Sequence, residues 1–204
     1  MENTSAQHSS LKLAILPGAP LFQLLGRFFS LFAGETANVA FMINLMSAFC
    51  SALAILFLFW TISALAKKLT LKSEDNNNLT SAQKTGIFGS AIVGALAYTF
   101  SDSFWFSATE GEVYAMSSTF TAITFWAILK WESESEDKHS ARWIILIAYL
   151  IGLSIGVHLL NLLAIPALVF IYYFKKYEVS KWGIAKVLLL AVILTGGIQG
   201  IIIP

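Results

Sequence analysis

The chain has 204 residues, of which 57% are hydrophobic and 12% charged, and its mean hydropathy is +0.72. Soluble domains carry about 25% charged residues, so this composition excludes an ordinary soluble protein and predicts an all-α, polytopic transmembrane helix bundle. The net charge of +1 argues against nucleic acid as a partner, and the single cysteine excludes a disulfide framework. Residues 1–16 are a polar tail without the order of a signal peptide.

Residues 17–38 predict a short helix at the outer membrane surface. Pro17 excludes regular helix at its position, and Pro20 suits the first helical position. Apolar residues then recur at spacings of three and four, with Gln23 and Arg27 off the stripe; they are Phe22, Leu25, Phe29 and Phe32. Such a pattern is typical of helices in the membrane interface, and a helix packed on the bundle is the alternative.

Residues 39–204 predict the transmembrane bundle, with about six membrane segments. We expect them near residues 39–66, 86–100, 113–129, 143–156, 159–174 and 187–203. A bilayer needs about 20 helical residues, so the 28 residues of the first segment would tilt or project. Ser90 and Gly94 in the second segment would let a neighbouring helix approach closely.

The 32 residues from Trp143 to Phe174 predict a broken pair of short or re-entrant helices. One straight helix of that length would be about 48 Å long, against roughly 30 Å of hydrocarbon. Residues 156–158, Gly-Val-His, lie near the middle and are the expected hinge. If the chain turns back there, eleven of the 13 basic residues lie on one side, and only Lys12 and Arg27 on the other. Because cytoplasmic loops are rich in Lys and Arg, this hairpin is favoured over a single crossing.

The stretch FSDSFWFSATEGEVY, residues 100–114, carries the candidate site. Asp102, Glu110 and Glu112 stand there among aromatic residues, between two apolar segments and with no basic residue nearby. Acids in such a position are costly to place and often functional. Helix capping is the alternative, because Thr109 and Glu112 have the spacing of a capping box.

His158 is the second part of the candidate site. The charge asymmetry places the apex of the hairpin on the outer side or at the midplane, where it can meet the acidic stretch. Breaks in membrane helices are common places for sites, and Asn161 follows about one turn later. A simple helix–helix hydrogen bond is the alternative for His158.

Three segments resemble a known family: LPGAPLFQLLGRFFSLFAG, FSDSFWFSATEGEVYAMSS and GLSIGVHLLNLLAIPALVFIYYFKKY. They resemble, in this order, a bacterial family of multi-spanning proteins of the domain-of-unknown-function kind, common in Bacteroidetes. That family is similar to the eukaryotic transmembrane protein O-mannosyltransferases and, more distantly, to the GT-C glycosyltransferases. The resemblance covers residues from about 15 to the end and implies a GT-C-like fold.

The resemblance implies part of a glycosyltransferase in the bacterial inner membrane, with its site on the periplasmic face. It would move a mannose-like sugar from a polyprenyl phosphate to a protein acceptor, so its partners would be the lipid-linked donor, the acceptor and membrane lipid. Whether the chain itself is an enzyme stays open. A transporter-type module that uses the same groups as an ion relay, or a non-catalytic membrane module, is the alternative.

Site roles also follow from the resemblance. The expected catalytic carboxylates are Glu112, Glu110 and Asp102, since transfer needs a base for the acceptor hydroxyl. Either linker acid could orient the acceptor or bind a divalent cation; no dedicated metal site is predicted, and we expect only one of the two acids to enter the site. The residues expected to bind substrate are His158, Asn161, Trp105, Tyr114 and Arg27.

The chain departs from the family pattern at its start. Ile15 and Leu16 stand where the family has His and Pro, and MENTSAQHSSLKLA stands where family members carry a first span and an Asp…Gly-Glu motif. That motif holds the catalytic base of GT-C enzymes. Family members also continue past Pro204. We therefore expect an internal fragment, inactive without the missing acid.

Overall fold

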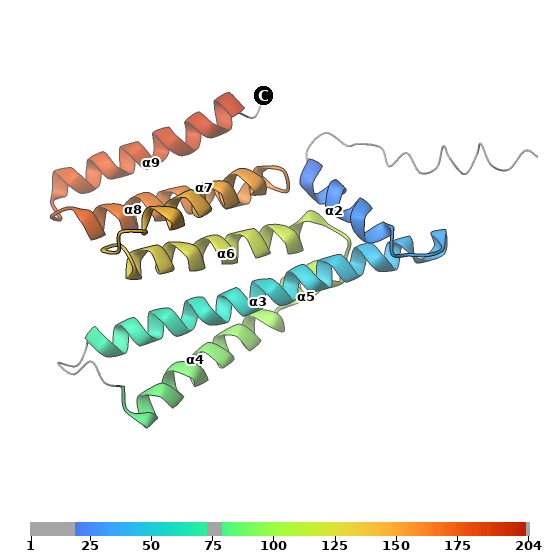
Figure 1. Cartoon of the computed structure of the whole chain (residues 1–204), viewed down its shortest axis with the longest axis horizontal. Helices are drawn as coiled ribbons and strands as arrows, with labels where there is room; N and C mark the ends of the chain where they lie inside the picture. Colours follow the sequence, from blue (N-terminus) through green and yellow to red (C-terminus); the bar gives the residue numbers. More distant parts are fainter. Residues whose placement is uncertain (1–18, 73–78, 203–204) are drawn as a thin grey trace, which may run out of the picture.

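The computed structural model describes residues 19–72 and 79–202, so the predicted polar tail and Pro204 lie outside the described residues. Every regular element in these ranges is helical, which confirms the all-α bundle. In chain order they are α2 (Pro20–Ser30), the 3-10 turn η1 (Thr36–Asn38), α3 (Val39–Lys72), α4 (Ser81–Thr99), α5 (Asp102–Thr109), α6 (Val113–Ser133), α7 (Ala141–Ile155), the 3-10 turn η2 (Leu159–Leu163), α8 (Ala164–Lys176) and α9 (Lys181–Ile202) (Figure 1).

Three helical stretches are long and apolar enough to cross a membrane: Thr36–Leu71, Leu159–Lys176 and Lys181–Gly200. The pair α4 and α5 would add a fourth if it forms one span, although it is bent by 67° at its break. The chain is therefore an integral membrane protein. The expected count of six membrane segments remains a prediction, because length and composition support three or four.

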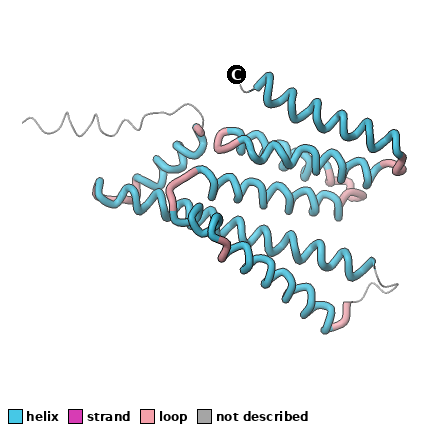
Figure 2. The backbone as a smooth tube through the Cα atoms, turned by 180° about the vertical axis from the view of Figure 1, so that it is seen from behind, coloured by secondary structure: helices cyan, strands magenta, loops and turns pink. Residues whose placement is uncertain are grey.

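Helix α6 lies between the two halves of the bundle, where it packs on α3, α7 and α8. Its hydroxyl residues Ser117, Thr119 and Thr124 are buried. The Thr119 hydroxyl donates to the backbone carbonyl of Cys50 in α3 over 2.6 Å. Small and hydroxyl-bearing residues let membrane helices approach closely and bond to one another, so hydroxyls on two sides of α6 suit its central position. Figure 2 shows the long helices side by side, with most connections gathered toward their two ends.

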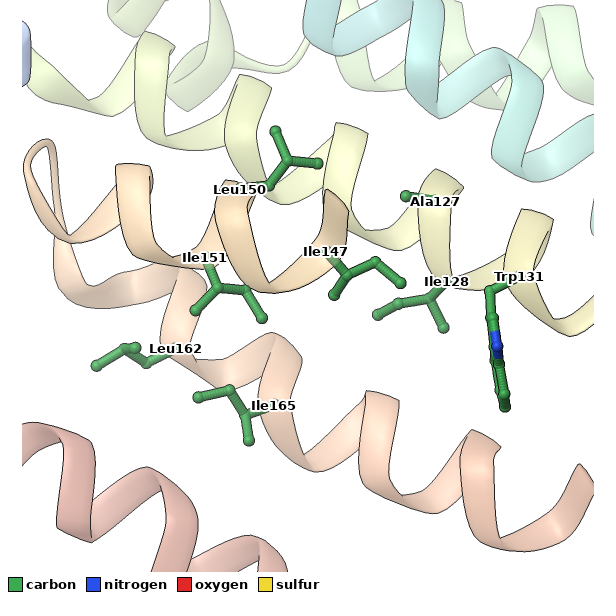
Figure 3. Packing of buried hydrophobic residues seen from close by; sticks show 8 residues of the cluster. All are labelled: Ala127, Ile128, Trp131, Ile147, Leu150, Ile151, Leu162 and Ile165. Atoms are coloured by element: carbon green, nitrogen blue, oxygen red, sulfur yellow. The ribbon is translucent and has the colours of Figure 1, made fainter. Parts of the chain in front are cut away.

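The chain breaks where the sequence predicts a hinge. Helix α7 ends at Ile155, and the chain resumes in η2 at Leu159. In Figure 3, Ile151 on the outgoing helix points toward Leu162 and Ile165 on the returning arm, whereas Ile147 points toward Ile128 of α6. The full cluster of buried residues that joins this hairpin to α6 consists of Ala127, Ile128, Trp131, Ile147, Leu150, Ile151, Leu162 and Ile165. Close packing of these branched side chains holds the arms together, since each contact adds dispersion energy.

The acidic stretch contains a helix that the sequence reasoning missed, α5. Ser101 stands at its N-cap position, Asp102 occupies its first turn, and Phe104 is buried against Tyr98 at a ring distance of 4.5 Å. An acid in the first turn suits the positive end of a helix. The expected segments 86–100 and 113–129 left residues 101–112 without a helix, and α5 occupies most of that gap.

Helix α4 begins at Ser81, earlier than the apolar pattern predicts. Thr80 Oγ1 accepts a hydrogen bond from the Gln83 backbone, and the Gln83 side chain accepts one from the Thr80 backbone. This capping box makes a polar first turn helical without any hydrophobic signal. Farther along α4, Gly94 lies against Ile62 of α3, so the expected close helix approach occurs at the glycine.

Four segments meet at one end of the bundle (Figure 1). They are helix α2, the first turns of α3, the start of α6 and the hairpin apex. The backbone N–H of Leu21 donates to the carbonyl of Gly156 over 2.8 Å. A small core closes this end, with Met46, Met116 and Val157 buried and Leu21, Phe22, Leu25 and Phe29 packed against them. The predicted stripe of α2 therefore largely faces the bundle.

A second set of apolar side chains on and after α2 faces outward. Its members are Leu24, Phe28, Leu31 and Phe32, each more than half exposed. Phe32 was expected on one apolar stripe with Phe22, Leu25 and Phe29, but helix α2 ends at Ser30, so the chain turns before Phe32 can follow the helical period. The outward set is the surface that an interfacial helix would offer to a membrane, and that placement remains a prediction.

Candidate functional site

The linker between α5 and α6 holds two of the predicted acids. Glu110 is the first residue after α5, and Glu112 is the last before α6. The Glu112 backbone N–H donates to the Glu110 carbonyl over 2.9 Å, which closes a tight turn around Gly111. A Cβ at Gly111 would lie 2.7 Å from the Ile43 Cγ2 methyl, so glycine lets the linker lie directly on α3.

The capping box predicted for Thr109 and Glu112 does not form. Ser107 and Thr109 lie inside α5, and their hydroxyls donate to carbonyls of that same helix. Glu112 itself occupies the N-cap position of α6 and makes no capping hydrogen bond. Both linker carboxylates are exposed and, within the described ranges, neither takes part in a hydrogen bond or ion pair. They are available to a ligand.

His158 contacts Tyr114, which follows the linker in the first turn of α6. The imidazole and phenol rings are 5.6 Å apart, and Tyr114 follows Glu112 by two residues. His158 Nδ1 accepts a hydrogen bond from the Leu160 backbone over 3.1 Å. A neutral imidazole that accepts at Nδ1 carries its proton on Nε2, so His158 offers one N–H donor to an anion.

Asn161 lies below the apex, completely buried. Its Nδ2 donates to Ser154 Oγ over 3.0 Å and to Thr124 Oγ1 over 3.3 Å, while its Oδ1 has no partner within the described residues. The side chain thus links the returning arm to α7 and α6. This geometry makes Asn161 a group that holds the apex in place rather than one that reaches an open surface.

The other predicted site residues lie farther out. Asp102 begins α5, about 12 Å along its axis from Glu110. Trp105 is half exposed and stacks on Phe100 at 6.1 Å. Arg27 is exposed in the last turn of α2, with Nη1 3.5 Å from Ser30 Oγ. The structure brings Tyr114 against His158, and Glu110 and Glu112 stand in the linker just before Tyr114, whereas Asp102 lies at the far end of α5.

A divalent cation would have few ligands here. Across residues 19–72 and 79–202, no group of three His, Cys, Asp or Glu side chains is placed to hold a metal ion. A hard cation takes six or more oxygen ligands, so beside Glu110 and Glu112 water or substrate oxygens would have to supply the rest.

Two residues of this region were missed by sequence reasoning. Gly111 is needed for the close approach of the linker to α3, and its position between two acids was the available signal. Ser154 anchors the apex, because its hydroxyl accepts from Asn161 and its carbonyl accepts from the His158 backbone over 2.8 Å. The sequence signal for Ser154 was a hydroxyl residue about one helical turn before His158 in the predicted hinge.

The sequence matches the family of the protein O-mannosyl-transferase TMEM260 N-terminal domain over residues 4–181. The chain belongs to this family. The match includes the α5–α6 linker and the whole hairpin. It also confirms the resemblance to O-mannosyltransferases, whereas the bacterial family and the GT-C class remain predictions.

The chain is also similar to the protein O-mannosyl-transferase tmem260 of Dictyostelium discoideum. The two are 28% identical over 151 residues, which is 71% of this chain and 16% of the relative. The chain therefore spans less than a fifth of that protein. No solved structure matches this sequence.

Proposed function

We propose that the chain forms the site-bearing part of an integral-membrane glycosyltransferase with a GT-C-like fold. It takes a mannose-like sugar from a polyprenyl phosphate and passes it to a hydroxyl of a protein acceptor. The observation that carries the proposal is the contact of His158 with Tyr114, which follows the acidic linker, in a member of the TMEM260 family, one of whose relatives is named a protein O-mannosyl-transferase.

The chemistry assigns different tasks to the two parts. In the transfer, the bond between the anomeric carbon and the phosphate oxygen breaks, and the acceptor oxygen forms a new bond to that carbon. The acceptor hydroxyl loses its proton to a carboxylate, and one linker acid orients that hydroxyl. The Nε2–H of His158 donates to the leaving phosphate, whose developing charge it stabilises. Tyr114, ring to ring with His158, supplies a flat apolar face against which a sugar ring can lie.

The proposal places this site on the periplasmic face of a bacterial inner membrane. With the hairpin in place, the eleven basic residues outside α2 and the N-terminal tail fall at the helix ends opposite the site. Cytoplasmic loops concentrate Lys and Arg, which supports an outward-facing site.

Conversion of Glu112 to glutamine tests the proposal. In a full-length relative that carries this segment, Glu112→Gln should lower the rate of sugar transfer about a hundredfold, the scale of a lost acid–base group. The change keeps the side-chain shape, and Glu112 makes no capping bond that could be lost. Transfer from radiolabelled polyprenyl-phosphate mannose to an acceptor peptide measures the rate, and Glu110→Gln identifies which of the two acids faces the acceptor.

The matched control is Glu35→Gln. Glu35 is an exposed acid just before η1 at the same end of the bundle, outside the predicted site, so its variant should retain transfer. Full activity in Glu112→Gln, in Glu110→Gln and in the double variant would contradict the proposed role of the linker.

A further inference from the structure

A pocket of about 400 Å³ lies at the end of the bundle opposite the candidate site. It forms where the C-terminal ends of α3, α6 and α8 come together, segments that are far apart in the sequence (Figure 1). Lysine side chains line it, and they are Lys67, Lys68, Lys130 and Lys175. Because α8 supplies Lys175, the pocket exists only when the hairpin returns the chain to this end.

Of the four lysines, two form no ion pair with any residue that the structure describes. Lys68 is paired with Glu132, the only acid in the lining, and Lys130 lies 3.6 Å from Glu134. Trp143 Nε1 donates to the Glu134 carboxylate over 2.6 Å and lowers the pKa of that carboxyl, which keeps Glu134 charged beside Lys130. Within the described parts of the chain, Lys67 and Lys175 have no ion pair.

The remainder of the lining is mainly apolar, and it continues along the membrane helix. Ala64, Leu65 and Trp126 line the pocket beside the lysines. From Ala64, steps of four residues along α3 lead to Trp60 and then Leu56, both 40% exposed. Residues four apart share one helix face, so an exposed apolar track runs from the charged pocket toward the middle of the bundle.

A positive pocket joined to an exposed apolar track fits a molecule with an anionic head and hydrocarbon chains. We propose that this pocket binds an anionic glycerophospholipid, with its phosphate between Lys67 and Lys175 and an acyl chain along the Ala64–Trp60–Leu56 face. Basic pockets between membrane helices are suited to such headgroups. A free anion would gain nothing from the apolar track, which is why the lipid fits better. The lipid site is separate from the proposed transfer site, and its test does not depend on whether the transfer function is correct.

Native mass spectrometry of the purified protein in neutral detergent, titrated with phosphatidylglycerol, tests the inference. Phosphatidylglycerol should bind more tightly than phosphatidylcholine. Each lysine near an anionic lipid surface is worth about fivefold in affinity, so Lys67→Gln with Lys175→Gln should weaken phosphatidylglycerol binding about 25-fold. Lys67→Arg with Lys175→Arg preserves the charge and should retain binding, which separates loss of charge from loss of fold.

The control pair is Lys84→Gln with Lys138→Gln, which removes the same charge from exposed lysines at this end that do not line the pocket. It should bind as the unchanged protein does. Ala64→Trp fills the pocket without changing its charge and should also block the lipid. If the control pair weakened phosphatidylglycerol binding equally, the lipid would be attracted by the general surface charge. That result would overturn the proposed site. Displacement of the lipid by millimolar inorganic phosphate would make it a free-anion site, and unchanged binding in the double variant would exclude it.

Discussion

At the scale of single residues, side-chain identity indicated candidate groups for a site but not which of them are accessible. Glu112 and His158 were singled out as charged or polar groups at breaks in apolar sequence, and both lie at the same end of the bundle. Asn161 satisfied the same criterion and is fully buried. The difference arises from the 3-10 turn η2, whose tighter winding aims position 161 at Ser154 and Thr124. An argument from the 3.6-residue period treats residues 159–163 as α-helix and therefore misplaces the Asn161 side chain.

The buried position of Asn161 predicts a loss of stability rather than a direct loss of binding. Asn161→Ala should lower the free energy of unfolding by about 1–2 kcal/mol, because two hydrogen bonds between helical segments disappear. Thr121→Ala is the control, since its hydroxyl donates only to the Ser117 carbonyl of its own helix. Chemical unfolding in detergent micelles measures both. A reduced affinity for the sugar donor at unchanged stability would instead mean that Asn161 reaches the substrate.

At the scale of elements, the sequence predicted the apolar helices and the hairpin break, because membrane helices depend on long uncharged runs that are visible in the sequence. It missed α5 because eight residues give too little periodicity to separate a helix from a loop. It also left open which face of α2 packs on the bundle, because apolar residues lie on both faces. Which of the two faces of α2 is packed depends on the surface of the helices that it meets.

The docking of α2 on the hairpin predicts a position-specific effect of alanine. A Cβ at Gly156 would lie 3.1 Å from Leu21 Cβ, so Gly156→Ala should push α2 away from the apex. Overpacking of this kind costs about 1–3 kcal/mol, so amide hydrogen exchange in residues 21–30 should accelerate at least about fivefold.

Gly152 provides the matched control for that experiment. A Cβ at Gly152, one turn earlier on the same helix, would meet no atom within 4 Å. Gly152→Ala should therefore leave the exchange of α2 unchanged. Equal exchange rates in both variants would mean that α2 does not depend on the apex for its position.

At the scale of the whole molecule, charge placement and packing lead to the same topology by independent routes. The division of basic residues predicted that residues 143–174 turn back, and the packed arms of α7 and α8 have that geometry. Neither route required knowledge of the family. The side of the membrane on which each end lies depends on insertion, which packing alone does not determine.

Two single cysteines test this topology. In a Cys50→Ala background, Ala37→Cys and Val179→Cys should react with a membrane-impermeant maleimide from opposite sides, Ala37→Cys from outside and Val179→Cys from the cytoplasm. Both positions are exposed, and Thr119 bonds to the backbone of residue 50, so the background change preserves that contact. Labelling of both from the same side would mean that residues 143–174 cross the membrane once.

The bond from Leu21 to Gly156 joins two backbone groups and uses no side chain. Any residue except proline can supply the N–H at position 21, and every residue has the carbonyl. Compensating changes between the two positions are therefore not required when related sequences diverge. Methods that infer contacts from correlated substitutions should detect little coupling here, and the attachment of α2 would have to be recognised from its neighbours Phe22, Phe29 and Val157 instead.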